Sequence, residues 1–422
     1  MADPAPLVIP AIVERHFEEA AALWPQRDAD VHGTQRTLEA LIELEERISA
    51  HLDGLRIARG CGWQESSIEP NLSDPGEAFV RVVLALEGRK PEALDRVLEA
   101  AEVDEAATRG VVSAFGWTSA DDLRGIVKEL LSSAHPFRRR IGIAACAVHR
   151  ADPGEVLQQA IVDADVPLRR RALRAIGELG RPDEDSLLSA QYESEDSGCR
   201  FWAGWAAVMT GDRAAGLKLL GSLGIQEPGY RARAMQVVLR VLAPSRAKDW
   251  LRLVREHSET QRDVLVGVAI AGDPAYVPWL IAQMEEPDHA RLAGEAFSTI
   301  TGVDLYLEQM TRDRPEGFHP GPTDDVDDEN VAMDPDTELR FPDPERVRAW
   351  WEANGARFLT GQRYVGGQPV NAEHCRQLLR QGRQGLRQAA AFELALMDPA
   401  APLFETRAPA RRQLRRLNAS GR

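Results

Sequence analysis

Hydrophobic residues recur with helical spacing along most of the chain. Apolar positions fall three and four residues apart with charged residues between them, which predicts amphipathic helices. The first two helices are expected over residues 8–24, ended by Pro25, and over residues 34–58. From Asp74 onward the expected helices are 75–87, 91–102, 105–115, 120–132, 137–149, 153–163, 168–180, 184–191, 199–210, 213–222, 230–243, 245–256, 260–271, 274–284 and 289–300. No alternating pattern of useful length indicates strands in this region, so the predicted class is all-α.

The central region, from Pro136 to Glu286, repeats with a period of 31 residues. One column of the repeat holds Arg138, Arg169, Arg200, Arg231 and Arg262. Three and seven residues after each arginine the chain carries small or apolar residues, and an acid precedes three of the arginines by four residues. Fixed periods of this size indicate stacked units that each bury one face against the next. The sequence therefore predicts a right-handed α-α superhelix, a solenoid of helical hairpins.

The regions that flank this array differ from it in composition. The repeat breaks at Gly302, and the residues that follow are rich in proline, glycine and acids, which is typical of disordered or functional segments. Helical periodicity then resumes, with two short strands expected around Gly366 and Gly367 and two further helices at 371–381 and 384–397. The predicted divisions are an N-terminal helical cap (1–72), the repeat array (73–302), an acidic Pro/Gly-rich insertion (303–344), a C-terminal helical cap (345–400) and a basic tail (401–422).

The acidic insertion and the basic tail carry opposite charges. Residues 324–338 hold eight acids and no base, whereas the tail holds six arginines and one glutamate. We expect the tail to be mobile. One hypothesis is that these acids pair with the arginines after Arg407.

Two segments of the array share an arginine followed by small and apolar residues: VPLRRRALRAIGELG (Val166 to Gly180) and YRARAMQVVLRVLA (Tyr230 to Ala243). Both resemble the second helix of a HEAT repeat, of the branch called PBS-lyase HEAT-like. The resemblance implies that an acid before this helix and the arginine inside it form a hydrogen-bonded ladder between neighbouring repeats. The pairs that match this pattern are Asp165/Arg169, Asp196/Arg200 and Glu227/Arg231. We therefore interpret the arginine column as structural and do not assign it to ligand binding.

A second resemblance extends over the whole chain. It is carried by LEERISAHLDGL (Leu44 to Leu55), GEAFSTITGVDL (Gly294 to Leu305), VRAWWEANGARFLTGQRYVGG (Val347 to Gly367) and PLFETRAPARRQ (Pro402 to Gln413). These segments resemble a proteobacterial family of HEAT-repeat proteins of unassigned function that are often encoded beside type VI secretion components. The resemblance implies an accessory of that apparatus, such as an effector chaperone, an adaptor or an immunity-like protein.

The formal net charge of −15 narrows the classes of partner. A protein that follows a phosphate backbone needs a basic face, and most of this surface would repel a nucleic acid. Hydrophobic content of 44% and charged content of 28% are ordinary for a soluble globular protein. Four scattered cysteines, no export signal and no apolar run long enough to span a bilayer predict a cytoplasmic protein with reduced thiols and no membrane contact.

Reactive residues do not form a motif for catalysis or metal binding. HEAT-repeat di-iron hydroxylases need His-Glu dipeptides, and the sequence contains none. His374 and Cys375 are adjacent on a predicted helix and point apart, and the acidic run 324–329 lacks the glycine and distal glutamate of an EF-hand loop. No phosphate-binding glycine loop or nucleophile elbow occurs. We therefore predict no catalytic residue, no metal site and no cofactor.

The outward positions of the repeat helices are better candidates for binding. Positions two, five and nine after the column arginine should line the concave surface of the array. They hold Arg140, Arg171, Arg174, Trp202, Trp205, Arg233, Gln236 and Arg240. Tryptophan and arginine are enriched at the hot spots of protein interfaces. The alternative is that Trp202 and Trp205 belong to the core, and the adjacent pair Trp350 and Trp351 leaves the same choice open.

Three functions compete on these observations. The predicted function is a non-enzymatic scaffold or adaptor that holds a protein partner on its concave face. The first alternative is a lyase-like enzyme of the HEAT-repeat class, for which no convergent polar pocket can be assembled from the spacing. The second alternative is nucleic-acid binding through the concave arginines at 138–140 and 169–171, which the net charge opposes. The sequence leaves the identity of the partner and the oligomeric state open.

Overall fold

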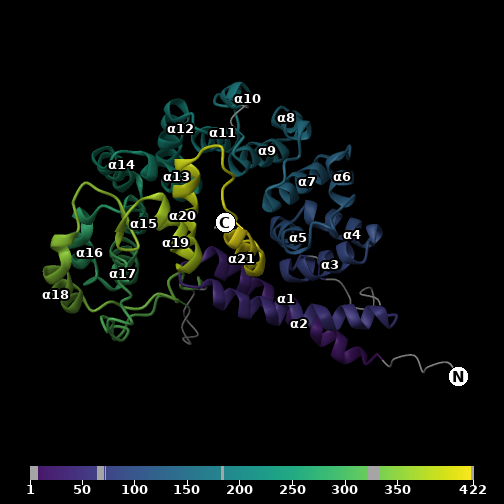
Figure 1. The fold of residues 1–422 in the computed structure, drawn as a ribbon, viewed down its shortest axis with the longest axis horizontal. Helices are drawn as coiled ribbons and strands as arrows, with labels where there is room; N and C mark the ends of the chain where they lie inside the picture. The colour runs from purple at the N-terminus through teal and green to yellow at the C-terminus, as the bar shows by residue number, and fades with distance from the viewer. Residues whose placement is uncertain (1–7, 64–70, 72, 182–184, 322–331, 420–422) are drawn as a thin grey trace. The chain divides into compact units, whose positions relative to one another are not determined.

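The protein is almost entirely helical in a computed structural model that describes residues 8–63, 71, 73–181, 185–321 and 332–419 (Figure 1). The fold class is all-α, as the hydrophobic pattern predicts. In the described part of the chain the regular strands are two residues long: β1 (Tyr364–Val365) pairs antiparallel with β2 (Gln368–Pro369). This hairpin confirms the expected pair of strands around Gly366 and Gly367.

The chain divides into two compact units. Unit 1 contains Met1–Asp212, Arg380–Gly385 and Asp398–Arg422, and unit 2 contains Arg213–Leu379 and Leu386–Met397. The boundary between Asp212 and Arg213 lies inside the stretch 73–302 that the sequence presents as one array.

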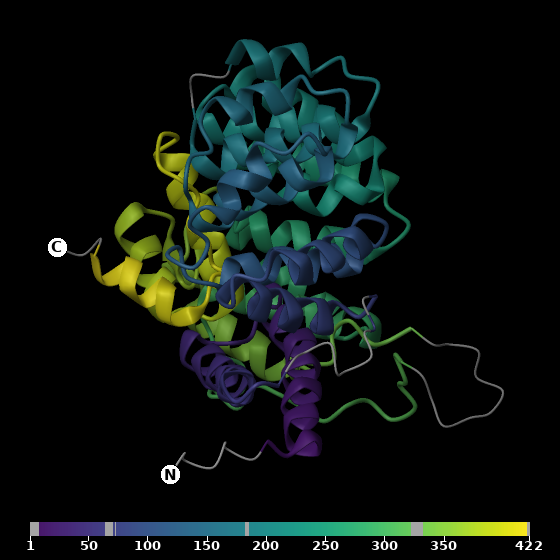
Figure 2. The same ribbon diagram turned by 90° about the vertical axis from the view of Figure 1, so that its right-hand side faces the viewer.

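Unit 1 begins with two long helices and continues as helical hairpins. Its helices are α1 (Pro10–His32), α2 (Leu38–Gly60), α3 (Pro75–Glu87), α4 (Pro91–Glu102), α5 (Glu105–Trp117), α6 (Ile126–Leu131), α7 (Pro136–His149), α8 (Glu155–Ile161), α9 (Val166–Leu179), α10 (Asp185–Ala190), α11 (Ser197–Thr210) and α21 (Ala410–Ala419). After α1 packs on α2 and α3, the inner helices α3, α5, α7, α9 and α11 pack one on the next (Figures 1 and 2). The outer helices α4, α6, α8 and α10 each pack on the inner helix that follows. Such consecutive packing is that of an α-solenoid.

Unit 2 contains three helical hairpins of its own. Its elements are α12 (Arg213–Gln226), α13 (Pro228–Val241), α14 (Pro244–His257), α15 (Gln261–Ala271), the 3₁₀ helix η3 (Pro274–Tyr276), α16 (Val277–Gln283), α17 (Pro287–Thr301), α18 (Pro344–Asn354), the 3₁₀ helix η4 (Gly355–Arg357), β1, β2 and most of α19 (Ala372–Gln381) and α20 (Gln384–Met397). The inner helices α13, α15 and α17 pack consecutively, and α12, α14 and α16 pack on them in turn.

The inner helices of unit 1 begin and end where the repeat supplies suitable residues. The Asp165 carboxylate accepts a hydrogen bond from the amide of Leu168 at 2.8 Å, and Asp196 caps the next inner helix in the same way. Such a cap satisfies one of the free amides at a helix start and contributes about 1 kcal/mol. The helices stop at Gly180 and Gly211, whose φ angles of 65° and 114° favour glycine. The repeat therefore encodes both ends of α9 and α11.

The prediction that Pro25 ends the first helix is wrong, because α1 continues through it to His32. Proline removes the backbone hydrogen bond to the carbonyl four residues earlier, which is that of Ala21. That carbonyl lies against α3, so close that a β-carbon on Gly76 would come within 2.2 Å of its oxygen. Trp24, beside the proline, is fully buried. Packing of the buried face of α1 thus outweighs the lost hydrogen bond.

In α9 the column arginine makes a local contact, and the neighbouring arginine joins its repeat to the next, whereas in α13 the column arginine Arg231 itself donates to Asp263 of the next inner helix at 2.8 Å. Arg169 donates to the backbone carbonyl of Asp163 at 2.6 Å, in the loop before its own helix. The contact to the next repeat comes from Arg170, whose Nε donates to Asp196 at 2.7 Å. The expected ladder contact Asp165/Arg169 is therefore corrected to Arg170/Asp196.

The described part of the acidic stretch pairs with arginines of unit 2. Asp336 accepts two hydrogen bonds from Arg262 at 2.7 and 2.8 Å, and Asp334 accepts two from Arg291 at 2.6 and 2.9 Å. Residues 322–331, which contain the densest acidic run, lie outside the described residues. Asp334 and Asp336 thus have partners other than the hypothesised tail arginines.

The expectation of a mobile tail is wrong for the described residues up to 419. The amide of Ala410, the first residue of α21, donates to the Glu45 carboxylate at 2.7 Å, and Arg416 donates to the carbonyl of His149. α21 packs on α2, and both views show the two helices side by side (Figures 1 and 2). The tail is therefore an integral part of unit 1.

Candidate functional site

Four of the predicted interface residues come together in unit 1: Arg171, Arg174, Trp202 and Trp205. Trp205 is 4% exposed, and its ring covers Gly177 of α9, where a β-carbon would come within 2.4 Å of it. Trp202 is half-buried, and its ring packs edge-on against that of Trp205 with the centroids 5.5 Å apart. The guanidinium of Arg174 lies 5.0 Å from the centroid of the Trp202 ring. Trp205 is thus a core residue, whereas Trp202 and Arg174 are partly accessible.

Glu178 joins the two arginines of this group. Arg171 Nη2 and Arg174 Nε donate to its two carboxylate oxygens at 2.9 and 2.8 Å. Burial raises the pKa of Glu178, but the charges of Arg171 and Arg174, together with those of Arg150 and Arg407, outweigh burial and bring that pKa to about 2. Burial lowers the pKa of Arg174 to about 10. At neutral pH the group therefore contains one carboxylate and two cations.

The C-terminal segment of the chain lies against this group. The amide of Leu403 donates to the backbone carbonyl of Glu178 at 3.0 Å, and the carbonyl of Leu403 accepts from Arg150 Nε. Two residues later, Glu405 lies 3.2 Å from Arg150 and 2.8 Å from Arg407. Burial raises the pKa of Glu405, but these two arginines bring it well below its ordinary value. Sequence reasoning missed this contact, because it joins residues more than two hundred positions apart.

Arg140 is placed away from the Arg171–Trp205 group, on α7 of unit 1. Its guanidinium lies 4.8 Å from the centroid of the Phe137 ring on the same helix. Burial lowers the pKa of Arg140, and three more distant carboxylates partly oppose this. The residue is half-buried and belongs to the packing at the start of α7.

The other three predicted interface residues belong to unit 2. Arg233 is exposed on α13. Arg240 Nη1 donates to the side-chain oxygen of Gln236 at 2.7 Å, and its Nε lies 3.2 Å from the Glu393 carboxylate of α20. Arg363 donates to the same carboxylate at 2.6 Å. Burial lowers the pKa of Arg240 to about 10, so this arginine belongs to an internal ion-pair cluster.

Both members of the Trp350–Trp351 pair pack against aromatic rings. Trp350 packs edge-on against Phe297 with the centroids 5.6 Å apart, and Trp351 lies 5.4 Å from Phe358. Both tryptophans are half-buried. Both rings also approach Phe358, which lies 6.5 Å from the Trp350 centroid, so Trp350 differs from Trp351 in its added contact with Phe297.

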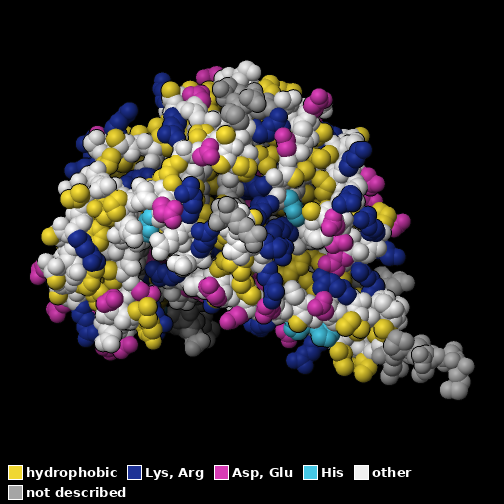
Figure 3. All heavy atoms as spheres, in the orientation of Figure 1, with side chains coloured by type: hydrophobic (Ala, Val, Ile, Leu, Met, Phe, Trp, Pro, Cys, Tyr) yellow, Lys and Arg dark blue, Asp and Glu magenta, His cyan; other side chains and the backbone are white. Residues whose placement is uncertain are grey.

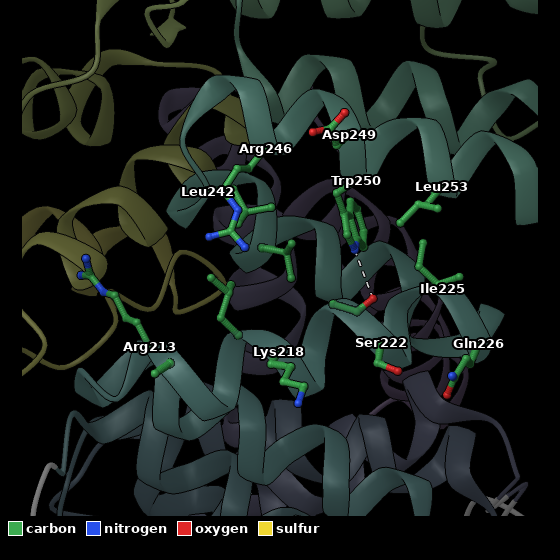
Figure 4. Close-up of a pocket in the computed structure, with 14 residues that line it drawn as sticks. Arg213, Lys218, Ser222, Ile225, Gln226, Leu242, Arg246, Asp249, Trp250 and Leu253 are labelled. Atoms are coloured by element: carbon green, nitrogen blue, oxygen red, sulfur yellow. Dashed lines mark hydrogen bonds between the residues drawn. The ribbon is translucent and has the colours of Figure 1, made fainter.

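An open groove on unit 2 is a candidate site that sequence reasoning did not find (Figure 4). It has a volume of about 700 Å³ and lies between α12 and α14, with a contribution from α13. Its apolar lining consists of Ala214, Leu217, Ile225, Val238, Leu242, Trp250 and Leu253. Three consecutive helices of one stack therefore form the groove.

Trp250, on α14, lies in the groove with its ring directed toward α12 (Figure 4). Its indole N–H donates to the carbonyl of Gly221 at 3.1 Å. A β-carbon on Gly224 would lie 3.1 Å from the same ring, so glycine at this position gives the ring room. Beside it, Leu253 is 41% exposed. The centre of the groove is thus a fixed aromatic ring with an accessible aliphatic neighbour.

The rim of the groove is mainly cationic. Lys218 of α12 and Arg246 of α14 are exposed, and Arg213 donates to a backbone carbonyl of α20. Asp249 is the acid among the lining residues, and its carboxylate lies 3.7 Å from Arg252. This local excess of cations contrasts with the net charge of −15 for the whole chain.

The described residues contain no group of three His, Cys, Asp or Glu side chains placed as metal ligands would be. His374 Nε2 bonds to the carbonyl of Val365 at 2.7 Å, and burial raises the pKa of the Cys375 thiol to about 11. Both residues therefore take part in packing around the β-hairpin. Within the same described ranges, every helix is too short or too polar to cross a membrane.

Comparison with known proteins adds no family to these observations. No protein-family model, curated protein or solved structure matches the chain. The architecture and the groove are therefore the basis for assigning a function.

Proposed function

We propose that the protein is a non-enzymatic scaffold that holds a protein partner in the groove between α12 and α14. The observation that carries this proposal is the apolar groove, open to solvent and bordered by cations. Protein interfaces typically combine an apolar, aromatic centre with a polar rim. Helix stacks support this role, because they present such surfaces on rigid elements.

The charges of the rim define the chemistry of the partner. Lys218, Arg246 and Arg213 surround the apolar lining, against the single acid Asp249 among the lining residues. A segment whose apolar side chains enter beside Trp250, with Asp or Glu on its flanks, complements this surface. Complementary charge increases association rates and selects against basic partners.

The two resemblances in the sequence sharpen the proposal. Similarity to HEAT-repeat proteins agrees with a scaffold, and similarity to proteins encoded beside type VI secretion components suggests a cytoplasmic accessory of that apparatus. The partner would then be an effector or another secretion component, and the protein an adaptor, an effector chaperone or an immunity-like factor.

The proposal is tested with charge-reversed variants of the groove. The double variant Lys218→Glu/Arg246→Glu changes two exposed rim residues. The matched control Lys248→Glu/Arg252→Glu makes the same charge change at exposed positions of α14 outside the groove lining. Partners retained by the tagged proteins from native lysate are quantified, and the affinity of a partner for each purified variant is then measured.

We expect the groove variant to bind the partner at least about tenfold more weakly than the control does, because two charge contacts become repulsive. Equal affinity of the two variants would contradict the proposal. Turnover of a small molecule, or retention of nucleic acid in place of a protein, would favour the enzymatic or the nucleic-acid alternative.

A further inference from the structure

A band of arginines in unit 1 is not neutralised by the acids within it. The band contains Arg150, Arg171, Arg174, Arg407, Arg412 and Arg416, and the carboxylates bonded to its members are those of Glu178 and Glu405. Arg412 donates to the backbone carbonyls of Trp117 and Thr118 at 3.2 and 3.1 Å. Four of these arginines, Arg150, Arg171, Arg174 and Arg407, thus share two carboxylates.

The arginines of this band influence one another and form one electrostatic cluster. Burial, followed by the charges of Arg416, Arg415 and Arg27, lowers the pKa of Arg412 to about 10. The charge of Arg150 likewise lowers the pKa of Arg416, and the charge of Arg407 lowers the pKa of Arg174. Figure 3 shows Lys and Arg side chains gathered near the C-terminus, where α21 lies. Like charges held together in this way attract anions from solution.

Nearby acids outside the band have partners of their own. The Glu45 carboxylate accepts from Arg27 at 2.9 Å and from the amide of Ala410 at 2.7 Å. The carboxylate of Asp28 lies 3.6 Å from both His32 and Arg109. Both acids also act on the band, because Asp28 raises the pKa of Arg407 and Glu45 raises that of Arg412, but each shares its charge with an arginine outside the band.

Part of the band can be reached from solvent. The side chains of Arg174 and Arg407 are 33% and 34% exposed. Arg174 is bonded to Glu178 through Nε, and the Trp202 ring packs on its guanidinium. Arg171 Nη1 is buried and has no hydrogen-bond partner among the described residues. The band thus offers guanidinium groups to an additional carboxylate.

The chain itself provides an example of the ligand that this face accepts. The segment at Leu403 bonds to the face through its backbone amide and carbonyl, and Glu405 inserts its carboxylate between Arg150 and Arg407. Residues 402–405 have no regular secondary structure. An extended peptide with an acidic side chain is therefore already bound in part of the band.

We infer that this arginine band is a binding surface for an acidic, extended segment of a partner protein. Carboxylates of that segment contact Arg174 and Arg407, and an adjacent apolar side chain packs on Trp202. The surface is less suited to nucleic acid, because a phosphate backbone needs exposed cations along its path and Arg150 and Arg171 are largely buried. The inference does not involve the groove of unit 2, so either proposal can fail without the other.

The test uses the full-length protein and a fluorescein-labelled poly-glutamate peptide, with binding measured by fluorescence anisotropy at physiological salt. Arg174→Gln removes an accessible cation of the band. Arg124→Gln is the matched control, because Arg124 is an exposed arginine of unit 1 that pairs locally with Asp121. A labelled single-stranded DNA of the same charge is measured in parallel.

We expect poly-glutamate to bind Arg174→Gln about tenfold more weakly than the control, as for the loss of one hydrogen bond to a charged group. Arg174→Lys keeps the charge and the aliphatic stem, and an intermediate affinity is expected for it. If Arg174→Gln melts at a lower temperature than the control, the affinity of Arg174→Lys is compared with that of the control instead. Equal affinities of all variants, or tighter binding of the DNA than of the peptide, would overturn the inference.

Discussion

The inner helices α9 and α11 of unit 1 and α15 and α17 of unit 2 carry arginines at related positions but bond them differently. In unit 1, Arg169 and Arg200 donate to carbonyls of the loop before their own helix, at distances of 2.6 Å for Asp163 and Ser194. In unit 2, Arg262 donates to an acid 74 residues away, and Arg291 to one 43 residues away. The arginines at these positions of α9 and α11 therefore make local contacts, whereas those of α15 and α17 contact the segment after position 331.

This difference in arginine contacts coincides with the loss of side-chain caps at the helix N-termini. Asp165 and Asp196 cap α9 and α11 through their side chains, whereas the residues before α15 and α17, Thr260 and Glu286, make no such bond. Where the repeat motif weakens, carboxylates of the acidic segment contact the arginines. The insertion thus has a structural role in unit 2 through its residues after position 331.

The largest expected effect comes from breaking the long-range contact at Arg291. Asp334→Ala leaves this arginine, which is 8% exposed, without its carboxylate. Removing one partner of a buried ion pair costs about 3–5 kcal/mol. We expect the urea midpoint of unit 2 to fall and the amides of α17 to exchange faster, as measured by hydrogen–deuterium exchange. Unchanged exchange in α17 would show that the insertion does not support this helix.

Truncation of Trp205 tests the local packing of unit 1. Trp205→Ala removes a buried ring that covers Gly177 and is expected to lower the free energy of unfolding by about 3–4 kcal/mol. Trp202→Ala should have a smaller effect, about 1–2 kcal/mol, because Trp202 is half-buried. Chemical denaturation followed by circular dichroism measures both. Similar losses for the two variants would contradict the assignment of Trp205, and not Trp202, to the core.

The two helix caps Asp165 and Asp196 should contribute differently to the free energy of unfolding, because Asp196 also accepts a hydrogen bond from Arg170. Asp196→Ala removes a helix cap and the acceptor of Arg170, for an expected loss of about 2 kcal/mol. Asp165→Ala removes a cap alone and should cost about 1 kcal/mol. If thermal melts place the two variants at the same stability, Arg170 does not connect the repeats energetically.

Acidification should weaken unit 2 by a smaller amount. The hydrogen bonds from Arg291 lower the pKa of Asp334 below its ordinary value. A lowered pKa in the folded protein contributes stability above the pKa of the unfolded chain, near 4, and this contribution is lost as the pH falls below it. We expect the amides of α17 to lose protection below about pH 4, with rates corrected for the pH dependence of intrinsic exchange, and this loss should be smaller in Asp334→Asn. An equal response of that variant would assign the acid sensitivity to other groups.

Helical periodicity was sufficient to predict the all-α class and most inner helices, because the buried face of each helix recurs in the sequence. It could not assign bonds to individual arginines. Arg139 donates to the carbonyls of Ser133 and Ala134, which is the loop contact that Arg169 makes one repeat later. The period placed Arg138 in that column, although Arg138 instead pairs with Asp95. Adjacent arginines are equivalent in composition, and packing decides which one reaches the loop.

The candidate sites depended on contacts that periodicity does not contain. The tail looked mobile because it is basic, yet Glu405 and Leu403 connect it to α7 and α9. The groove had one local signal, the glycines of α12 at 221 and 224, whose small size lets Trp250 approach. Glycine disfavours a helix interior, so such positions point to close packing.

The central claim, that a protein partner binds the groove of unit 2, is tested most directly by site-specific photo-crosslinking in native cells. A benzophenone amino acid is placed at Leu253 inside the groove, or at Arg252 beside it as the control. We predict one discrete protein adduct from position 253, none from position 252, and loss of the adduct when Lys218→Glu/Arg246→Glu is added. No adduct at 253, or the same adducts from both positions, would contradict the claim.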